Sequence, residues 1–371
     1  MNDKTTGRPR VFINGRFLAQ RITGVQRFGR ELLQAIDRCL AQDRAGDRQF
    51  HITVLAPEDA VLPQFASLEI ETLAGNGSHR WEQLTLPRRV GSHLLVNPGF
   101  TGPVIKRNQI VTVHDGAVVR MPEGYSAQFR LWYRFAVGLI GRRAAATMAV
   151  SQFSAGEATE CFGIPADRLH VCGEGWQHIQ AVESDPSVLR DSALGHHEYF
   201  LVVSSPARHK NFAVVAAALE SLGQRAPRCI AVGAADKRVF RGAGGNEAGI
   251  EHVGYVSDGQ LKALYEHALG FIMPSFYEGF GIPPLEAMAC GAAVIASTAP
   301  ALREVCADAA SYFDPESPAQ LAAAITELQT DPARAAVLRN AARARLEHYS
   351  WDKAALCYLD LIARQLGRGR A

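Results

Sequence analysis

Two glutamates, Glu278 and Glu286, stand eight residues apart on either side of the turn Gly279-Phe280-Gly281. The apolar run Gly270–Met273 before them predicts the end of a buried strand. Pro283-Pro284 after the turn indicates the first turn of a helix, because proline fixes φ and lacks the N–H that a first turn leaves unpaired. The unpaired N–H groups and positive partial charge of such a helix start attract phosphate oxygens. The segment therefore predicts an anion site flanked by two carboxylates.

Each carboxylate has an expected partner at such a site. Glu286 falls in the first helical turn, where it can accept hydrogen bonds from a ribose diol, as the acidic residue of dinucleotide-binding folds does. Glu278 precedes the turn and can reach the hydroxyl groups of a sugar beyond the phosphates. For either Glu alone, a helix-dipole partner or a surface charge is the simpler interpretation, but the composite pattern favours a sugar-nucleotide site. Its donor-binding residues would lie in the turn and the helix start: Gly279, Phe280, Gly281 and Ile282.

A basic pair follows the first predicted strand of the second half, Tyr199–Ser204. Lys210, which precedes Asn211, falls at the carboxyl edge of that strand, where open α/β sheets bind ligands. Lys210 and Arg208 are therefore candidates to neutralise a diphosphate. Two surface charges at a helix start are the weaker interpretation, because cations there oppose the helix dipole unless an anion lies between. Recognition of the base is expected from the backbone near Val256.

Two segments of the first half also carry candidate residues. Thr23-Gly24-Val25 follows the first predicted strand in a loop that can approach phosphates, with Arg27 behind it. His114 and Asp115 end the apolar run Ile110–Val113, which predicts a strand whose end lies at a ligand edge. A simple turn at the glycine and a packed or capping histidine are the alternatives.

The segment from Glu278 to Glu286 resembles the E-x7-E signature of retaining glycosyltransferases of family 4. The resemblance extends over nearly the whole chain. Its other matches are Gly15-Arg16, Thr23-Gly24-Val25-Gln26-Arg27, Val113-His114-Asp115, Pro122-Glu123, Val150-Ser151-Gln-Phe-Ser154, Lys210-Asn211 and Tyr349-Ser350-Trp351. It implies the GT-B fold, an α/β architecture of two Rossmann-like, doubly wound domains that face a central cleft.

The resemblance also implies roles for individual residues. His114 would lie against the donor sugar, Lys210 would neutralise the donor phosphates and Glu278 would position sugar hydroxyl groups. The family usually carries an Arg several residues before this Lys, but the segment Val202–Ser205 contains none. Arg208 would therefore be an offset substitute.

The activity implied by the resemblance is that of a hexosyltransferase that retains the anomeric configuration, with Gly24 and Val25 on the donor side and Arg27 and Asp115 on the acceptor side. The chain most resembles the mannosyltransferase-like branch that builds bacterial O-antigen and exopolysaccharide chains. This favours GDP-mannose as the donor and a glycan or polyprenyl-diphosphate-linked acceptor, while a UDP- or dTDP-linked donor stays open. A sugar-nucleotide epimerase and a noncatalytic GT-B subunit are alternatives. The E-x7-E pattern disfavours the first, and the presence of both the Glu and the Lys disfavours the second.

Metal ions and cofactors are not expected to take part. The chain contains no Asp-x-Asp motif, the usual metal and diphosphate ligand of the other major glycosyltransferase fold. The charge of a departing phosphate would then be stabilised by Lys210 and by helix N–H groups. Seven scattered cysteines form no C-x-x-C pair and are odd in number, so they predict neither a zinc site nor a disulfide framework. They indicate a reducing compartment.

The composition is that of an ordinary globular protein of two domains, with 371 residues, 47% hydrophobic and 20% charged. No stretch approaches the ~20 apolar residues of a membrane span, and residues 1–10 lack the apolar core of a signal peptide, so a cytoplasmic location is expected. Residues 1–180 carry 21 Lys and Arg against 16 Asp and Glu, whereas the remainder carries 18 against 21. The basic first half suggests an anionic acceptor or a membrane surface as its partner. No nucleic-acid partner is expected.

The segment Phe129–Arg143 is the candidate for membrane contact, because it mixes aromatic residues with Arg130, Arg134, Arg142 and Arg143 on a predicted helix. Such a helix can lie on anionic headgroups at the inner face of the plasma membrane. Packing of its apolar residues against the sheet of its own domain, with a solvated arginine face, is the favoured interpretation, since a GT-B helix needs such residues for its core.

Short apolar runs alternate with helical periods along the chain, as a parallel α/β architecture requires. Strands are predicted at 11–14, 51–55, 92–97, 109–114 and 147–151, and again at 199–204, 228–233, 250–253, 270–273 and 293–297. The polar segment 179–197 indicates a linker. We therefore expect an N-terminal acceptor-side domain at 1–178 and a nucleotide-sugar-binding domain at 198–351. The resemblance implies that a last helix, 352–371, packs back onto the first domain.

Overall fold

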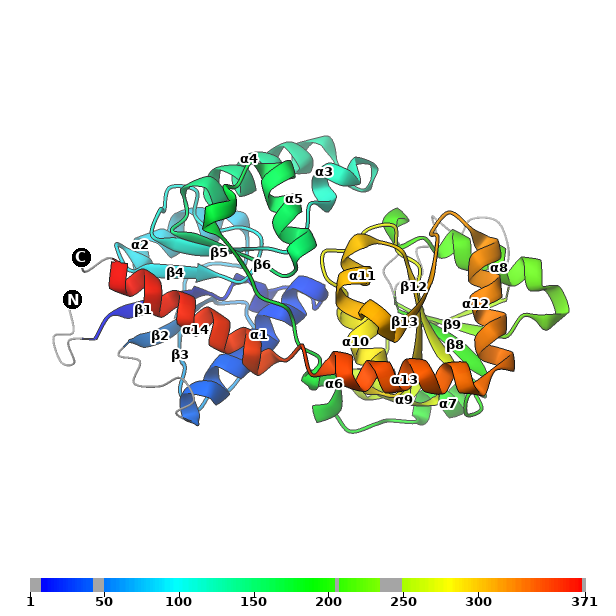
Figure 1. Cartoon of the computed structure of the whole chain (residues 1–371). Helices are drawn as coiled ribbons and strands as arrows, with labels where there is room; N and C mark the ends of the chain where they lie inside the picture. The colour runs from blue at the N-terminus through cyan, green and yellow to red at the C-terminus, as the bar shows by residue number, and fades with distance from the viewer. Residues whose placement is uncertain (1–7, 43–49, 204–206, 234–248, 369–371) are drawn as a thin grey trace. The chain divides into compact units, whose positions relative to one another are not determined.

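The computed structural model describes residues 8–42, 50–203, 207–233 and 249–368 (Figure 1). The chain forms two compact units, one made of residues 1–175 and 351–371 and the other of residues 176–350. Each unit is built on its own parallel sheet with helices packed against it. The prediction of two Rossmann-like α/β domains is confirmed.

The first unit contains a seven-stranded sheet in the order β3-β2-β1-β4-β5-β6-β7. All its neighbouring strands are parallel. The strands are β1 (Arg10–Asn14), β2 (His51–Pro57), β3 (Glu69–Leu73), β4 (Leu94–Asn97), β5 (Gln109–Val113), β6 (Ala146–Ala149) and β7 (Leu169–Val171). Central strands such as β4 and β5 are buried along their whole length, which is the usual environment of parallel strands covered on both faces.

Six α-helices of the described chain belong to this unit: α1 (Gly24–Ala41), α2 (Leu86–Val90), α3 (Ala117–Arg120), α4 (Ala127–Arg143), α5 (Gln152–Phe162) and α14 (Trp351–Arg368). Shorter turns are η1 (Arg16–Ala19), η2 (Trp81–Thr85), η3 (Pro122–Gly124) and η4 (Ala166–Arg168). The last helix, α14, lies along α1. Phe28 packs edge-on against Trp351 with 5.9 Å between ring centroids, and Arg38 Nη2 lies 3.1 Å from Asp352 Oδ1. These contacts join the two ends of the chain within one unit.

Helix α4 differs from its expected packing. Its second half is buried in the unit, from Ala136 to Gly141, as the core-packing interpretation required. In its first half, however, Leu131 is 73% exposed and Phe135 is 56% exposed. The interpretation that all apolar residues of this helix serve the sheet is therefore wrong for these side chains, which are four residues apart and so share the solvent-exposed face of the helix. No helix in the described ranges combines the length and apolar character that crossing a membrane requires.

The second unit contains a six-stranded sheet in the order β10-β9-β8-β11-β12-β13, again with parallel neighbours. Its strands are β8 (Tyr199–Val203), β9 (Arg228–Val232), β10 (Ile250–Gly254), β11 (Gly270–Met273), β12 (Ala293–Ser297) and β13 (Ala310–Phe313). Its α-helices are α6 (Gln177–Ala181), α7 (Ser187–Asp191), α8 (Phe212–Leu222), α9 (Asp258–His267), α10 (Ile282–Ala289), α11 (Pro300–Cys306), α12 (Pro318–Thr330) and α13 (Pro332–Leu346). Three short turns complete it: η5 (Arg208–Lys210), η6 (Gly223–Arg225) and η7 (Ala307–Ala309).

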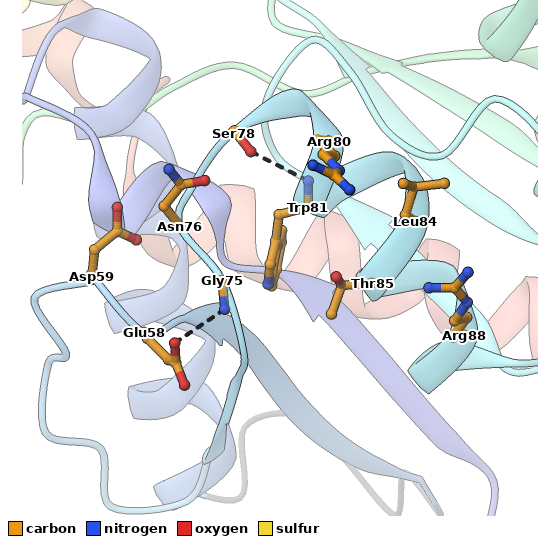
Figure 2. Close-up of a pocket in the computed structure, with 10 residues that line it drawn as sticks. All are labelled: Glu58, Asp59, Gly75, Asn76, Ser78, Arg80, Trp81, Leu84, Thr85 and Arg88. Carbon is orange, nitrogen blue, oxygen red and sulfur yellow. Dashed lines mark hydrogen bonds between the residues drawn. The ribbon is translucent and has the colours of Figure 1, made fainter.

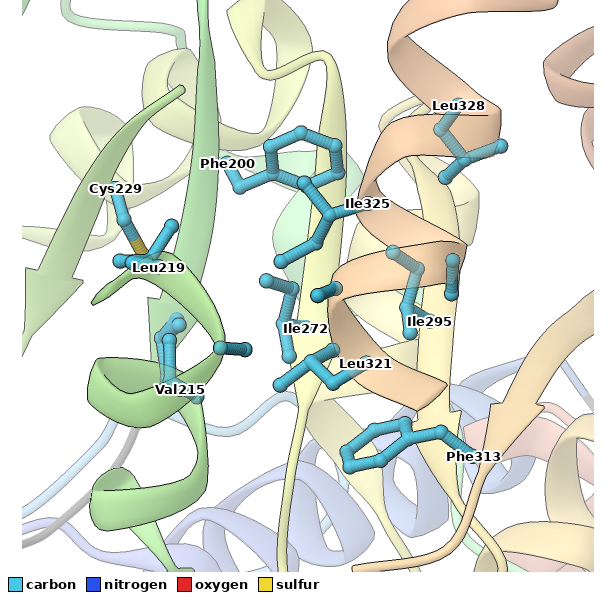
Figure 3. Packing of buried hydrophobic residues seen from close by; sticks show 14 of the residues in the cluster. Phe200, Val215, Leu219, Cys229, Ile272, Ile295, Phe313, Leu321, Ile325 and Leu328 are labelled. Atoms are coloured by element: carbon cyan, nitrogen blue, oxygen red, sulfur yellow. The ribbon is translucent and has the colours of Figure 1, made fainter. Parts of the chain in front are cut away.

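One face of this second sheet packs against α8 and α12 (Figure 3). Ile272 of β11 and Ile295 of β12 point toward Leu321 and Ile325 of α12. Val215 of α8 belongs to the same buried cluster. Full burial of a branched aliphatic side chain stabilises a fold by about 1.5–3 kcal/mol. This core holds the strand ends in place, and the loops that follow those ends carry the candidate site.

Every predicted strand is present, with ends that differ by at most two residues. Ser204, the predicted end of the strand at 199–204, lies outside the described residues. The prediction missed β3, β7 and β13, which all lie at sheet edges. The sequence of β3, Glu-Ile-Glu-Thr-Leu, alternates because this strand is partly exposed, and β7 has only three residues. Neither strand forms the continuous apolar run by which the buried strands were predicted.

The segment predicted as a linker, 179–197, belongs to the second unit. It carries the helix α7 and is bound to α9 at several points. Lys262 Nζ donates to Val182 O at 2.8 Å, and Asp185 N donates to Gly259 O at 3.0 Å. Its polar composition thus reflects a partly exposed segment that hydrogen bonds fix to the unit.

Each sheet has a strand at which the order reverses. β1 lies between β2 and β4, and β8 lies between β9 and β11. The loops that leave such neighbouring strands diverge to opposite faces, which creates a crevice at the carboxyl edge where ligands bind. In the first unit, Asn14 and Asn97 end the two strands at this switch point. In the second unit, the two strands lead to Lys210 and Glu278.

Candidate active site

The loop after β11 leads into the predicted helix start. α10 begins at Ile282 and carries Pro283 and Pro284 in its first turn. Gly281, directly before it, has φ 122°, and a Cβ at this position would lie 2.9 Å from Leu302 Cδ2. A residue other than glycine would therefore be strained here. The prediction of a proline-initiated helix after the turn is confirmed.

Lys210 and Glu278 form an ion pair at the switch point of the second unit. Lys210 Nζ lies 2.6 Å from Glu278 Oε1 and 2.8 Å from Oε2. Lys210 ends η5, after β8, and Glu278 lies in the loop between β11 and α10. Their side chains are 20% and 12% exposed, so both charged groups can be reached from solvent. A cation beside a carboxylate can bind the two chemical parts of a sugar nucleotide, namely phosphate oxygens and sugar hydroxyl groups.

Asn211 explains how Lys210 is held beside the second loop. It adopts φ 54°, in the left-handed region that Asn tolerates better than most residues. Its Nδ2 donates to Pro274 O at 3.2 Å and to Pro315 O at 2.8 Å. Phe276 N also donates to His209 O at 2.8 Å. These bonds tie the loop after β8 to the loop after β11, and so fix the approach of the lysine to Glu278.

Glu286 is part of a buried network in the second unit. It lies in α10, and His178 Nε2 of α6 is 2.7 Å from its Oε1. Tyr265 OH of α9 donates to its Oε2 at 3.0 Å. The expected role for this carboxylate was contact with a ribose. Because an ionised carboxylate has about four acceptor positions, the two protein contacts leave acceptor capacity for a ligand while they fix the orientation of Glu286.

His178 and Tyr265 are residues of this network that the sequence prediction missed. His178 is the last residue of the predicted N-terminal domain, and the sequence analysis assigned no role to Tyr265. No spacing signal joins them to Glu286, since they come from separate helices, α6 and α9. Their contribution depends on tertiary packing.

Two predicted donor-binding residues in the turn have their side chains in the protein core. Phe280 is buried, and its ring packs edge-on against Tyr349 with 5.3 Å between ring centroids. Ile282 is also buried. Any contribution of these residues to donor binding therefore falls to their backbone groups, as it does for Gly279 and Gly281, which have no side chain.

Arg208 and Val256 lie at the edge of the same sheet. Arg208 begins η5 and is exposed, and its side chain makes no hydrogen bond or ion pair with another residue in the described part of the chain. Val256 is half-buried and follows β10, just before the capping residue Ser257 of α9. Both positions agree with the predicted loops.

His114 lies where β5 ends, as predicted, but in a closely packed environment. Its Nε2 is 2.8 Å from Pro98 O, which requires a proton on that nitrogen, and its Nδ1 is 3.6 Å from Glu174 Oε1. The rings of Phe28 and Phe100 pack against the imidazole, with distances of 4.8 and 5.2 Å between ring centroids. One carbonyl, one carboxylate and two aromatic rings thus hold the imidazole in a single orientation.

The neighbouring candidates of the first unit have local partners. Asp115 Oδ1 accepts a hydrogen bond from Ala117 N at 2.8 Å, which begins α3. Arg27 Nη1 lies 3.8 Å from Glu31 Oε1 on the next turn of α1. Gly24 begins α1, and a Cβ added there would meet no atom within 4 Å. Packing among the described residues therefore does not require glycine at position 24. Val25, beside it, lines a cavity at the first switch point.

A second cavity of the first unit, of about 600 Å³, lies in the loops after β2 and β3 (Figure 2). Acidic side chains, Glu58 and Asp59, line one side, and Arg80 and Arg88 line the other. Glu58 Oε2 accepts a hydrogen bond from Gly75 N at 3.1 Å. No predicted site residue lines this cavity. Across the described residues, no cluster of three His, Cys, Asp or Glu side chains is arranged to hold a metal ion.

Comparison with known proteins places the second unit in a family. A family model described as Glycosyl transferases group 1 matches residues 190–345. O-antigen chain mannosyltransferase B of Escherichia coli is 28% identical over 286 residues, which cover 74% of this chain and 75% of that protein. The serotype-specific mannosyltransferase WbdA of Escherichia coli is 30% identical over 238 residues, 60% of this chain but 29% of that protein. The match therefore spans less than a third of WbdA.

The likeness to solved structures covers both units. The structure of Anabaena Alr3699/HepE in complex with UDP-glucose superposes with a TM-score of 0.70 at 18% sequence identity, covering 97% of this chain and 99% of that one. At this identity the likeness shows the fold alone. Lys210, Glu278 and Glu286 all fall within the matched family domain. Residues 190–345 therefore form a group 1 glycosyltransferase domain, and the chain has the GT-B fold.

Proposed function

We propose that the chain transfers mannose from GDP-mannose, with retained anomeric configuration and without a metal ion, to a glycan or polyprenyl-diphosphate-linked acceptor in bacterial surface polysaccharide synthesis. The observation that carries the proposal is the Lys210–Glu278 pair at the switch point of a group 1 glycosyltransferase domain. The choice of mannose is supported by two relatives that are named mannosyltransferases, one of them matched over most of its length.

The donor would be bound by groups of the second unit. Lys210 Nζ would neutralise phosphate oxygens together with N–H groups at the start of α10. Glu278 would then accept hydrogen bonds from sugar hydroxyl groups, and Glu286, oriented by His178 and Tyr265, would accept from the ribose. When the donor binds, Lys210 and Glu278 would exchange each other for the phosphate and the sugar hydroxyl groups. Each charged group would then keep a polar partner, which avoids the penalty of a desolvated lone charge.

The reaction would break the bond between the anomeric carbon and the phosphate oxygen, and form the bond to the acceptor oxygen on the same face. The leaving phosphate would take the proton of the acceptor hydroxyl. A double displacement of the hydrolase type would need a carboxylate that attacks the anomeric carbon, whereas in this proposal Glu278 accepts hydrogen bonds from the hydroxyl groups of the donor sugar. The cation would instead stabilise the charge that develops on the leaving group.

The donor proposal is tested with a panel of GDP-mannose, UDP-glucose, UDP-N-acetylglucosamine and dTDP-rhamnose. GDP-mannose is expected to raise the thermal unfolding temperature most, because a ligand that binds only the folded state stabilises it more at a given concentration the lower its Kd is. It should also be the sugar transferred, with an α-linkage by NMR and an unchanged rate in EDTA. Transfer from a UDP- or dTDP-sugar alone, or loss of transfer in EDTA, would contradict the donor or the metal-free mechanism.

The role of the carboxylate is tested by Glu278→Gln, which keeps the size of the side chain and removes its charge. The matched control is Glu316→Gln, an exposed glutamate of the same unit. We expect kcat to fall in the first variant and to stay unchanged in the second. Equal rates in both variants would remove Glu278 from the proposed site.

Peripheral membrane contact through α4 is part of the proposal. Leu131 and Phe135 are exposed on a helix that also carries Arg130 and Arg134. Apolar side chains between arginines can enter the headgroup region of an anionic bilayer. Sedimentation with phosphatidylglycerol vesicles is expected for the native protein and not for Leu131→Ser/Phe135→Ser, with Val337→Ser, exposed on the second unit, as control. Equal sedimentation of all three proteins would exclude this helix as the contact.

A further inference from the structure

The switch point of the first unit contains a buried carboxylate that the proposed donor site does not use. Glu82, on η2, has a side chain that is 1% exposed. Asn14 Nδ2, at the end of β1, donates to its Oε1 at 3.0 Å, and Thr101 Oγ1, after β4, donates to its Oε2 at 2.8 Å. His79 Nδ1 lies 3.3 Å from the same Oε2. Three segments far apart in sequence thus meet at one carboxylate.

The network keeps this buried group ionised. Burial alone would raise the pKa of Glu82, but the hydrogen bond with His79, the charge of Arg16 and the bonds from Thr101 and Asn14 lower it below the ordinary value. A buried charge is expensive unless it is paired and fully hydrogen-bonded. An apolar side chain would serve the core of the unit at lower cost, so the arrangement points to a role at the sheet edge.

Arg16 links the buried carboxylate to the surface. Its Nε lies 3.5 Å from Glu82 Oε1, its Nη1 lies 3.0 Å from His79 Nδ1, and its side chain is 13% exposed. Gly15 sets this position, because a Cβ there would lie 2.7 Å from Leu55 O of β2. The backbone can therefore turn sharply out of β1 and direct the next residue, the arginine, toward the network.

A cavity of about 220 Å³ opens onto these groups. Its polar lining includes Arg16, Glu82, Thr101 and Gln26, and aromatic rings are supplied by Phe100 and Tyr133. Thr23 and Val25, from the loop predicted to approach the donor, also line it. The cavity is smaller than the roughly 300–1,000 Å³ of pockets for drug-sized ligands, which suits a single sugar ring.

The chemistry of the lining fits a neutral pyranose better than a phosphate. A pyranose has an apolar C–H face that packs on aromatic rings and a rim of hydroxyl groups that both donate and accept. The cavity supplies donors on Arg16 and acceptors on Thr101 and Gln26, next to the rings of Phe100 and Tyr133. The charges of Arg16 and Glu82 also offset each other, so the site offers no excess positive charge for an anion.

We infer that this cavity binds the terminal neutral pyranose of the acceptor, and that Glu82 is a positioning residue that holds Arg16 against a sugar hydroxyl group. The inference rests on the proposed glycosyl transfer and deepens it by naming the acceptor class. The enzyme then extends a glycan that already ends in a sugar, and a polyprenyl phosphate without a sugar is not its acceptor.

The first experiment measures binding without any donor. Saturation-transfer NMR with methyl α-mannobioside is run on the native protein, on Arg16→Gln and on Glu82→Gln. The matched control is Arg80→Gln. Arg80 is two residues before Glu82 in the chain but lines the separate cavity of Figure 2. Signals are expected for the native protein and the control and should be lost in the other two. No signal with the native protein, or equal signals in all four, would overturn the inference.

The second experiment separates acceptor from donor effects in the full enzyme. Arg16→Gln is expected to raise the acceptor KM by roughly tenfold or more, the change that loss of a hydrogen bond to a charged group gives, with the donor KM unchanged and partial recovery in Arg16→Lys. If Glu82→Gln does not fold, the acceptor KM values of Arg16→Gln, Arg16→Lys and Tyr133→Ala still test the inference. An unchanged acceptor KM with normal transfer would sink this inference and leave the proposed function intact, whereas a native enzyme without transfer would sink the proposed function itself.

Discussion

The two switch points hold their charged groups in different ways. In the second unit, Lys210 and Glu278 pair directly with each other, and both side chains are partly exposed. In the first unit, Glu82 is enclosed and shared among Asn14, Thr101 and other donors. An open pair can exchange its partner for a ligand at little cost, whereas an enclosed carboxylate keeps its partners and acts by orienting them. We therefore expect the second unit to bind the charged part of the donor, and the first unit to bind a neutral sugar of the acceptor.

The largest expected effect is the loss of the cation in the open pair. Lys210→Met keeps the length of the side chain and removes its charge. We expect kcat to fall by about 10²–10³, the effect of removing one charge-stabilising donor from a transition state. This fall in kcat is measured as the rate of donor turnover at a saturating acceptor concentration. The unfolding temperature should change little, because the side chain is partly exposed. A variant with native kcat would show that the open pair does not act on the leaving group.

The second effect compares the open carboxylate of the second unit, Glu278, with its enclosed carboxylate, Glu286. Glu286→Ala removes the acceptor of His178 and Tyr265, which leaves two buried polar groups without this partner. We expect weaker GDP binding by calorimetry and also a loss of stability of about 1–3 kcal/mol. Tyr265→Phe, which removes one bond and retains the carboxylate, should weaken GDP binding less. Native GDP affinity in Glu286→Ala would take the ribose contact away from this residue.

The third effect tests whether Glu82 contributes as an ion. Because the pKa of Glu82 is lower in the folded protein than its ordinary value of 4.5, its stabilising contribution is complete above that pH and is lost as the pH falls through the folded pKa. The difference in urea midpoint between the native protein and Glu82→Gln should therefore be constant from pH 8 to pH 5 and should narrow at lower pH. A difference that persists unchanged at pH 3 would mean that the carboxylate is not the stabilising form.

The same contrast explains what the sequence could predict. Most of the predicted site of the second unit comes from one continuous stretch of chain, because one strand, one loop and one helix supply Glu278, the turn and Glu286. Lys210 follows the end of another strand, β8. Short-range rules about proline, glycine and helix starts therefore locate the continuous stretch. The network around Glu82 joins the end of β1, η2 and the loop after β4, and its carboxylate lies in a segment with no strand end or glycine turn. Only the strand order brings these residues together, and a predicted strand order was not available from periodicity.

The fold was predicted well for the same physical reason. Buried parallel strands are continuous apolar runs, so Gln109–Val113 and Gly270–Met273 are evident in the sequence. Edge strands such as β3 alternate with polar residues and were missed. Leu131 and Phe135 show the opposite error, because apolar residues expected to be buried are exposed. An apolar residue in a helix does not by itself reveal whether it faces the sheet or solvent.

The smallest expected effect concerns Arg208, the offset substitute for the arginine that the family resemblance places upstream. It is exposed and begins η5 two residues before Lys210, and its side chain has no hydrogen-bond or ion-pair partner among the described residues. An exposed cation interacts with a phosphate through high-dielectric solvent and is screened by salt. We therefore expect Arg208→Gln to raise the donor KM only about two- to threefold at low salt, with no difference from the native enzyme at 0.5 M NaCl. A loss as large as that of Lys210→Met, unaffected by salt, would instead make Arg208 a direct phosphate ligand, and the open pair of the second unit would then be a cluster of three charged groups.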